Sequence, residues 1–250
     1  MLGRFLGFSI EARRRAASFD FYRSLGFEPV AVDDGDAVPY AAFSDGTVAI
    51  GLHDAGPFGD AGIAVEAPGP VPTFVRPNLQ TYVRGLRRLG IELELERLAA
   101  DEFNQVAFCD PDGHPIRLVE ARTFSPGAWN SRNVAACGEF LELSIAARAI
   151  GHSQTFWQAL GFETVARGDD PHPWIRLAGH GLVIGLHERA PFAPGLTFHA
   201  RHLAARYEYL KAKGLDGRRG GPLAAAPERC VTLLAPEGTP LYLLDAGDGD

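Results

Sequence analysis

The chain contains an internal repeat, and a repeat constrains the fold strongly because each copy has to form the same structure. The segment that begins at Phe5 aligns without a gap with the segment that begins at Phe140, and this alignment places Tyr22 on Trp157. Two later segments also repeat, IGLHDAGPF as IGLHERAPF and DPDGHPIRLVE as APEGTPLYLLD. We therefore predict two copies of one domain, which suits a length of 250 residues.

The segment between the copies, ARTFSPGAWNSRNVAACG, is rich in Ser, Gly, Asn and Pro, which break regular structure. We place the boundary near Pro126 to Asn133. The predicted organisation is a first domain at residues 1–123, a linker at 124–136 and a second domain at 137–247.

Within each copy the hydrophobic period changes in a fixed order. An alternating strand leads into a helix whose apolar residues recur at three and four positions, and this helix stops at Gly26 or Gly161. Three strands follow, and the same order then begins again with a helix that ends at Gly90 or Gly214. Each copy is therefore predicted to contain two βαβββ units, closed by a hairpin whose turn is DPDG or APEG.

Two of these stretches, FYRSLGFE from Phe21 and DPDGHPIRLVE from Asp110, resemble the vicinal oxygen chelate superfamily, which includes glyoxalase I, extradiol dioxygenases and bleomycin-resistance proteins. The resemblance covers nearly the whole chain twice and omits only the linker and the GDGD tail. It implies an α+β fold of tandem glyoxalase-like domains. In each domain two βαβββ units would form a half-open barrel, with helices outside and a ligand cleft on the concave face.

Side chains alternate between the two faces of a strand, so the first strand of each copy can be divided into an apolar face and a cleft face. The cleft face would also carry His53 and His187 from a later strand of each copy. The predicted apolar faces are Leu6, Phe8 and Ile10 in copy one and Leu141, Leu143 and Ile145 in copy two; the predicted cleft faces are Phe5, Gly7, Ser9 and Glu11 in copy one and Phe140, Glu142 and Ser144 in copy two.

Metal-dependent members of the superfamily resemble one another in placing His, Glu or Gln on the first, fourth, fifth and eighth strands. Glycine and valine offer no side-chain ligand, and a guanidinium repels a cation. We therefore predict no metal cofactor. The matching positions in this chain are Gly7, Gly51, Val71 and Arg117 in copy one, and Glu142, Gly185, Gly195 and Tyr242 in copy two.

The second copy leaves two interpretations open for its ionisable residues. In one, Glu142, His187 and His199 form an unusual three-ligand metal site. In the other, Glu142 is a solvated cleft carboxylate, and His187 and His53 make ordinary hydrogen bonds at strand ends. The remaining histidines are interpreted as structural: His114, His152, His172, His180 and His202.

Other side chains suit an organic ligand. Arg117 and Tyr242 offer hydrogen bonds and stacking, although Arg117 could instead pair with a carboxylate such as Glu11. Trp157 belongs to the helical apolar stripe and is predicted to lie in the core, whereas Trp174 lines a pocket mouth or covers a sheet edge. No catalytic residue is predicted; the predicted ligand-binding residues are Glu142, His187, His199, Tyr242, Arg117, His53 and Glu11.

Composition excludes several classes of partner. A net charge of -7 with few clustered basic residues argues against nucleic acid, and no apolar run reaches the roughly 18 residues of a membrane span. The N-terminus lacks the pattern of a signal peptide, so we expect a cytoplasmic protein. The three cysteines are too far apart for a disulfide framework or a zinc site.

The leading functional hypothesis is metal-independent binding of a small organic molecule in the cleft, by a monomer or homodimer. An acidic cleft with Glu11 and Glu142 would favour a cationic or hydrogen-bonding aromatic ligand. The alternative is a divalent-metal lyase, isomerase or dioxygenase, either lactoylglutathione-lyase-like or dioxygenase-like, with a rearranged site around Glu142 and His187. A third hypothesis is an interaction module without a ligand.

Overall fold

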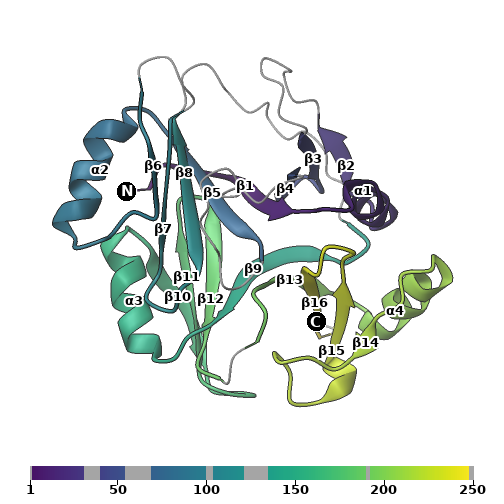
Figure 1. The fold of residues 1–250 in the computed structure, drawn as a ribbon. Coiled ribbons are helices and arrows are strands. Elements are labelled where there is room, and N and C mark those ends of the chain that lie inside the picture. The colour runs from purple at the N-terminus through teal and green to yellow at the C-terminus, as the bar shows by residue number, and fades with distance from the viewer. Residues whose placement is uncertain are drawn as a thin grey trace.

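The computed structural model describes residues 2–30, 40–53, 69–99, 104–120, 135–189 and 192–247. These residues form two eight-stranded mixed sheets and four α-helices, an α+β arrangement that confirms the predicted fold class (Figure 1). No helix among them is long and apolar enough to cross a membrane. Most of the predicted linker, residues 124–134, lies outside the described residues.

The first copy forms one sheet with the strand order β2-β3-β4-β1-β5-β8-β7-β6. Its elements are β1 (Arg4–Glu11), α1 (Arg15–Ser24), β2 (Glu28–Val30), β3 (Tyr40–Ser44), β4 (Ala49–His53), β5 (Val71–Arg76), α2 (Leu79–Arg88), β6 (Leu95–Arg97), β7 (Gln105–Cys109) and β8 (Pro115–Glu120).

The second copy forms the other sheet with the matching order β10-β11-β12-β9-β13-β16-β15-β14. Its elements are β9 (Glu139–Ala146), α3 (Ile150–Ala159), β10 (Glu163–Gly168), β11 (Trp174–Gly179), β12 (Leu182–His187), β13 (Gly195–Ala200), α4 (Leu203–Ala212), β14 (Arg218–Arg219), the short 3-10 helix η2 (Pro227–Arg229), β15 (Cys230–Leu234) and β16 (Pro240–Asp245).

Each sheet consists of the two predicted βαβββ units. In the first copy β1 runs parallel to β4 and β5 parallel to β8, and the two units meet through the antiparallel pair β1 and β5. The first helix of each copy ends at the predicted glycine. Gly26 and Gly161 follow α1 and α3 with φ of +92° and +97°, values that an L side chain rarely adopts.

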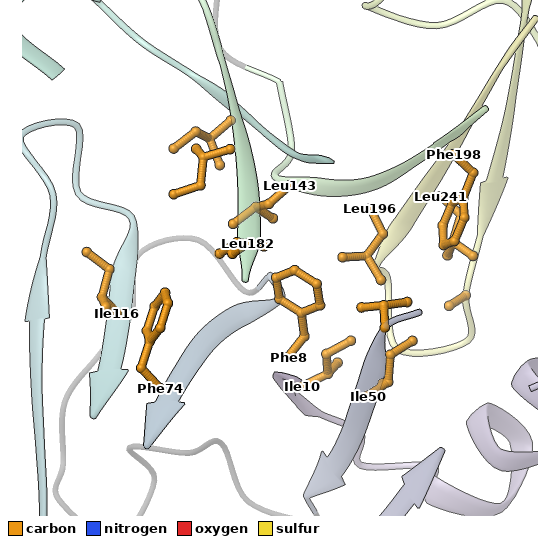
Figure 2. Close-up of a cluster of buried hydrophobic side chains, with 14 of the residues drawn as sticks. Phe8, Ile10, Ile50, Phe74, Ile116, Leu143, Leu182, Leu196, Phe198 and Leu241 are labelled. Atoms are coloured by element: carbon orange, nitrogen blue, oxygen red, sulfur yellow. The ribbon is translucent and has the colours of Figure 1, made fainter. Parts of the chain in front are cut away.

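The apolar faces of the two sheets pack toward each other, and one hydrophobic core serves both copies (Figure 2). Phe8 and Ile10 from β1 lie opposite Leu143 from β9 and Leu196 from β13, and all four are at most 2% exposed. Figure 1 places α2 and α3 at one side of the molecule and α1 and α4 at the other. The polar face of each sheet therefore points away from the other copy.

The prediction that Phe5 and Phe140 lie on the cleft face is wrong, because both first strands contain an irregularity. On β9, Glu142 pairs with Thr197 but Phe140 pairs with Phe198, so Leu141 is an extra residue that reverses the alternation. The Phe140 ring consequently joins the core, 5.8 Å from the ring of Phe8 and 5.7 Å from that of Phe198. The register of β1 shifts in the same way between Phe5 and Gly7.

Two hairpin turns clamp the copies together reciprocally. In the turn between β15 and β16, the Glu237 carboxylate accepts hydrogen bonds from Ser18 Oγ at 2.6 Å and from the Tyr22 hydroxyl at 2.7 Å, both on α1. In the turn between β7 and β8, Asp112 accepts a hydrogen bond from Ser153 on α3 and pairs with Arg148. The carboxylate of each turn thus finds its hydrogen-bond partners in the other copy.

Tyr22→Phe tests the first of these clamps. Tyr22 is fully buried, and its hydroxyl donates to a charged group. Its loss should lower the free energy of unfolding by about 1.5–3 kcal/mol, measured by urea titration. Tyr209 is 51% exposed, so Tyr209→Phe removes the same hydroxyl from the surface and should change stability by less than about 0.5 kcal/mol. Equal effects of the two variants would contradict the role of the clamp.

Candidate functional site

The predicted ligand-binding residues divide between two separate polar faces. The expected acidic cleft shared by Glu11 and Glu142 is therefore wrong, because the two carboxylates belong to sheets whose polar faces point in different directions. The structure places Glu142, His187, His199 and Tyr242 on the C-terminal sheet, and Glu11, His53 and Arg117 on the N-terminal sheet.

Glu142 forms the centre of the polar face of the C-terminal sheet. The expectation of a solvated carboxylate is wrong, because the side chain is buried, with 0% of the residue exposed. Three side chains donate to its oxygens: Arg176 Nε in a close ion pair, His187 Nε2 at 2.8 Å and Ser144 Oγ at 2.7 Å. Ser144 in turn lies 2.6 Å from the hydroxyl of Thr197. The carboxylate is thus held by groups from three neighbouring strands.

These contacts also determine the charge of Glu142. Burial by itself raises the pKa of this carboxyl, but the hydrogen bond and charge of His187, the charge of Arg176 and the hydrogen bond of Ser144 outweigh it and hold the pKa below its ordinary value of 4.5. Glu142 is therefore an ionised, buried and fully partnered carboxylate. Its charge is balanced by Arg176.

His172 extends the network and was not predicted as a site residue. It lies in the loop before β11, and its Nε2 is 3.0 Å from Nδ1 of His187. Burial, together with the charges of His187 and Arg189, lowers the pKa of His172 to about 4. A difference between the two copies could have pointed to His172. Trp174 pairs with His187 as Tyr40 pairs with His53, so His172 corresponds in sequence to Val38 of the first copy.

Aromatic rings surround this network. Trp174 begins β11, as expected of a residue at a strand start, and the Arg176 guanidinium lies 4.6 Å from its ring centroid. Phe192 lies 5.8 Å from the ring of His187 and 6.1 Å from that of Tyr242. Tyr242 is only 3% exposed, and burial raises the pKa of its hydroxyl, which donates to the carbonyl of Ala193.

The positions that resemble metal-ligand positions do come together in the C-terminal sheet, but two of them have to be glycine. A Cβ at Gly185 would lie 2.0 Å from Oε1 of Glu142, and a Cβ at Gly195 would lie 2.5 Å from Cε2 of Tyr242. The Glu142 carboxylate and the Tyr242 ring thus occupy the space that ligand side chains on the fourth and fifth strands would need.

The residues present do not fit a divalent metal ion. Both oxygens of Glu142 already accept hydrogen bonds, and Tyr242 uses its hydroxyl on the backbone. In the ranges that the structure describes, no three His, Cys, Asp or Glu side chains are grouped so that they could hold a metal ion. Glu142, His187 and His199 therefore do not form the three-ligand site that the sequence left open.

His199 lies on β13 on the same face and is partly exposed. Burial and the charge of Arg176 lower its pKa, whereas the charges of Glu142 and Glu139 raise it. His199 is therefore close enough to Glu142 and Arg176 for their charges to influence its pKa.

The N-terminal sheet keeps the hydroxyl pair of this site but not its charges. Ser9 Oγ lies 2.9 Å from Thr73 Oγ1, as Ser144 does from Thr197. In this sheet Gly7 stands at the position of Glu142. Ala42 stands at the position of Arg176, because Ala42 pairs with Gly51 as Arg176 pairs with Gly185.

The predicted site residues of the N-terminal copy have other partners. Arg117 donates to Gln105 through Nε at 3.0 Å and through Nη2, while Glu11 forms an ion pair with Arg13 at the surface. Burial and the charge of Arg117 lower the pKa of His53 to about 4. The geometry thus favours the C-terminal copy as the place of a working site.

The fold is that of extradiol dioxygenases and glyoxalases, which confirms the fold implied by the superfamily resemblance. A catechol 2,3-dioxygenase has 13% identity over 100% of this chain and 96% of its own, with a TM-score of 0.57. The Mn(II)-bound glyoxalase from Novosphingobium aromaticivorans has 15% identity over 96% of this chain and 81% of its own, with a TM-score of 0.59.

A third similar structure, 2,2',3-trihydroxybiphenyl 1,2-dioxygenase from the dibenzofuran-degrading Sphingomonas wittichii strain RW1, has 16% identity over 98% of this chain and 91% of its own, with a TM-score of 0.58. At these identities the likeness establishes the fold alone. No family model and no curated protein matches the chain.

Gly185→Ala tests whether Glu142 fills the space beside β12. The added Cβ would displace a carboxylate held by three donors, so the free energy of unfolding should fall by about 1–3 kcal/mol in a urea titration. A Cβ added at Gly151 in α3 would meet no neighbouring atom within 4 Å, and Gly151→Ala should stabilise by about 0.4–1 kcal/mol. A Gly185→Ala variant as stable as the natural protein would contradict the close approach.

Glu142→Gln tests the charge of the carboxylate. Because the folded-state pKa lies below 4.5, ionisation stabilises the fold above about pH 4.5, and this contribution is lost as the pH falls through the folded pKa. The variant should be less stable by about 3–5 kcal/mol at pH 7, and the difference from the natural protein should shrink below pH 4.5. Glu163 on β10 is exposed, so Glu163→Gln is the matched control. A difference that does not change with pH would show that Glu142 is not ionised.

Proposed function

We propose that the protein binds a small organic molecule, without a metal ion, at the polar face of its C-terminal sheet. The observation that carries this proposal is that both oxygens of Glu142 already accept hydrogen bonds, from Arg176, His187 and Ser144. The same carboxylate fills the space beside Gly185. A metal ion would have to displace these donors from a fully buried group, at a cost of several kcal/mol.

The groups at this face favour an aromatic, hydrogen-bonding ligand. Trp174, Arg176 and His199 are partly exposed, and the Arg176 side chain keeps 21% of its surface accessible beside the Trp174 ring. A planar guanidinium and an indole both stack on flat rings. Because Arg176 neutralises Glu142, an acidic cleft no longer supports a cationic ligand. The proposed ligand is therefore an aromatic compound with polar substituents.

The second candidate, a metal-dependent lyase, isomerase or dioxygenase, is favoured by the shared fold with a Mn(II)-bound glyoxalase and by the contact between His187 and Glu142. A metal site here would require Glu142 to break its ion pair with Arg176 and another side chain to come close enough to bind the metal ion. We rank it second for that reason. The accompanying proposals, a cytoplasmic monomer or homodimer without nucleic-acid or membrane partners, follow from composition and charge.

The test measures metal content and ligand binding on the same preparation. Protein purified without chelators should contain far less than one equivalent of iron, manganese, nickel or zinc by elemental analysis. A thermal-shift screen of aromatic compounds should give stabilisation, and ligand at 100 times its Kd should add about 2.7 kcal/mol, unchanged by EDTA. Trp174→Ala should weaken this binding, while Leu234→Ala, at a 65% exposed position on another strand, should not.

Near-stoichiometric metal that disappears in Glu142→Ala would overturn the proposal in favour of the metal enzyme. Absence of any stabilisation across a broad library of aromatic compounds would favour an interaction module instead.

A further inference from the structure

The two arginines of β14 point to opposite faces of the C-terminal sheet. In the antiparallel pair of β14 and β15, Arg219 lies opposite Val231 and Arg218 lies opposite Thr232. Val231 belongs to the hydrophobic core, and Arg219 accordingly lies on the helix side of the sheet, 3.9 Å from the carboxylate of Glu208 on α4. Because side chains alternate along a strand, Arg218 lies on the polar face.

Arg218 stands in the same row of cross-strand neighbours as Glu142. The row runs from β14 to β9 through Arg218, Thr232, Tyr242, Thr197 and Glu142. Burial raises the pKa of the Tyr242 hydroxyl, and the positive charge of Arg218 opposes this rise. The guanidinium of Arg218 is therefore close enough to Tyr242, in the middle of the row, for its charge to act there.

The positive charge of Arg218 is not balanced by the groups around it. Glu142 already has its counter-charge in Arg176. Glu139 lies beside His199 in the ladder of β9 and β13, where its charge raises the pKa of that histidine. Among the residues that the structure describes, no carboxylate forms an ion pair with Arg218, and its side chain is exposed. The polar face thus carries an accessible cation, since an arginine stays charged at any physiological pH.

The two arginines of this face act on its middle from opposite sides. The charge of Arg176, from β11, reaches His199 on β13, and the charge of Arg218, from β14, reaches Tyr242 on β16. The strands β13 and β16 are paired neighbours. The ring of Trp174 lies 4.6 Å from the Arg176 guanidinium. A flat molecule stacked beside Trp174 would therefore have its far end directed toward the half of the face that carries Arg218.

We propose that Arg218 binds a carboxylate group of the bound molecule, so that the site selects ionised aromatic acids. This inference rests on the proposed function and specifies its ligand class. The planar guanidinium offers two parallel N–H donors that match the two oxygens of a carboxylate, and such charge-assisted pairs are strong. One unpaired arginine balances a single negative charge, which favours a carboxylate over a phosphate monoester with a charge near -2.

The experiment compares ligand pairs of nearly equal shape that differ in charge. Benzoate with benzamide, and indole-3-carboxylate with indole-3-carboxamide, are titrated at pH 8 by calorimetry. Each carboxylate should bind at least about tenfold more tightly than its amide, and the difference should shrink in 1 M salt, which screens exposed charges. If acid and amide bind equally well, small-molecule binding stands but the role of Arg218 is overturned. If none of the four binds, this inference fails, and the proposed function is decided by the broader library of aromatic compounds.

Two adjacent arginines supply a matched pair of variants. Arg218→Gln and Arg219→Gln remove the same charge from neighbouring exposed positions, but from opposite faces of the sheet. Both should leave the unfolding midpoint in urea nearly unchanged. Arg218→Gln should abolish the preference for the acids, whereas Arg219→Gln should keep it, and Arg218→Lys should retain part of it because it keeps the charge without the planar fork. A preference that survives Arg218→Gln, or that both glutamine variants reduce equally, would overturn the proposal.

Discussion

The structure depends on one constraint, which is that each sheet buries its apolar face against the other copy. Phe8 and Phe140 meet across this interface, and the residues around them are shielded from water by both sheets at once. Separation of the copies would expose these side chains to water, so the contact between the two copies contributes to the stability of both. The reciprocal turn clamps at Asp112 and Glu237 add polar contacts that set the two copies in register.

Each sheet also has a polar face that points away from the other copy, and on this face of the C-terminal sheet the chain places a buried charge. A fully buried carboxylate is costly unless every oxygen is partnered, and Glu142 meets that condition through donors from β9, β11 and β12. The same side chain forces residue 185 to be glycine. A polar network of this kind is held in one geometry, which suits a preformed binding surface better than a site that exchanges ligands with a metal ion.

Local patterns were enough to predict the elements of the fold, whereas the site depended on contacts between distant strands. The glycines at 26 and 161 and the DPDG turn act through their own backbone, so the sequence shows them directly. The faces of β9 could be predicted only from Glu142 onward, because the extra residue before it, Leu141, is defined by the pairing of β9 with β13. Arg176 and His172 were missed for the same reason, since only the pairing of β11 with β12 brings Arg176 to Glu142 and places the loop before β11 so that His172 lies beside His187.

Comparison of the two copies separates what the scaffold needs from what the site adds. Both copies keep a hydroxyl pair at the junction of their central strands, Ser9 with Thr73 and Ser144 with Thr197, and both keep the histidine at the end of the fourth strand. The second copy has both Glu142 and Arg176, and the first copy has neither. Either residue without the other would leave a buried charge without a partner. Since the copy without them folds in the same way, the ion pair is not a requirement of the fold. Its presence in one copy alone therefore supports the proposed placement of the site on the C-terminal sheet.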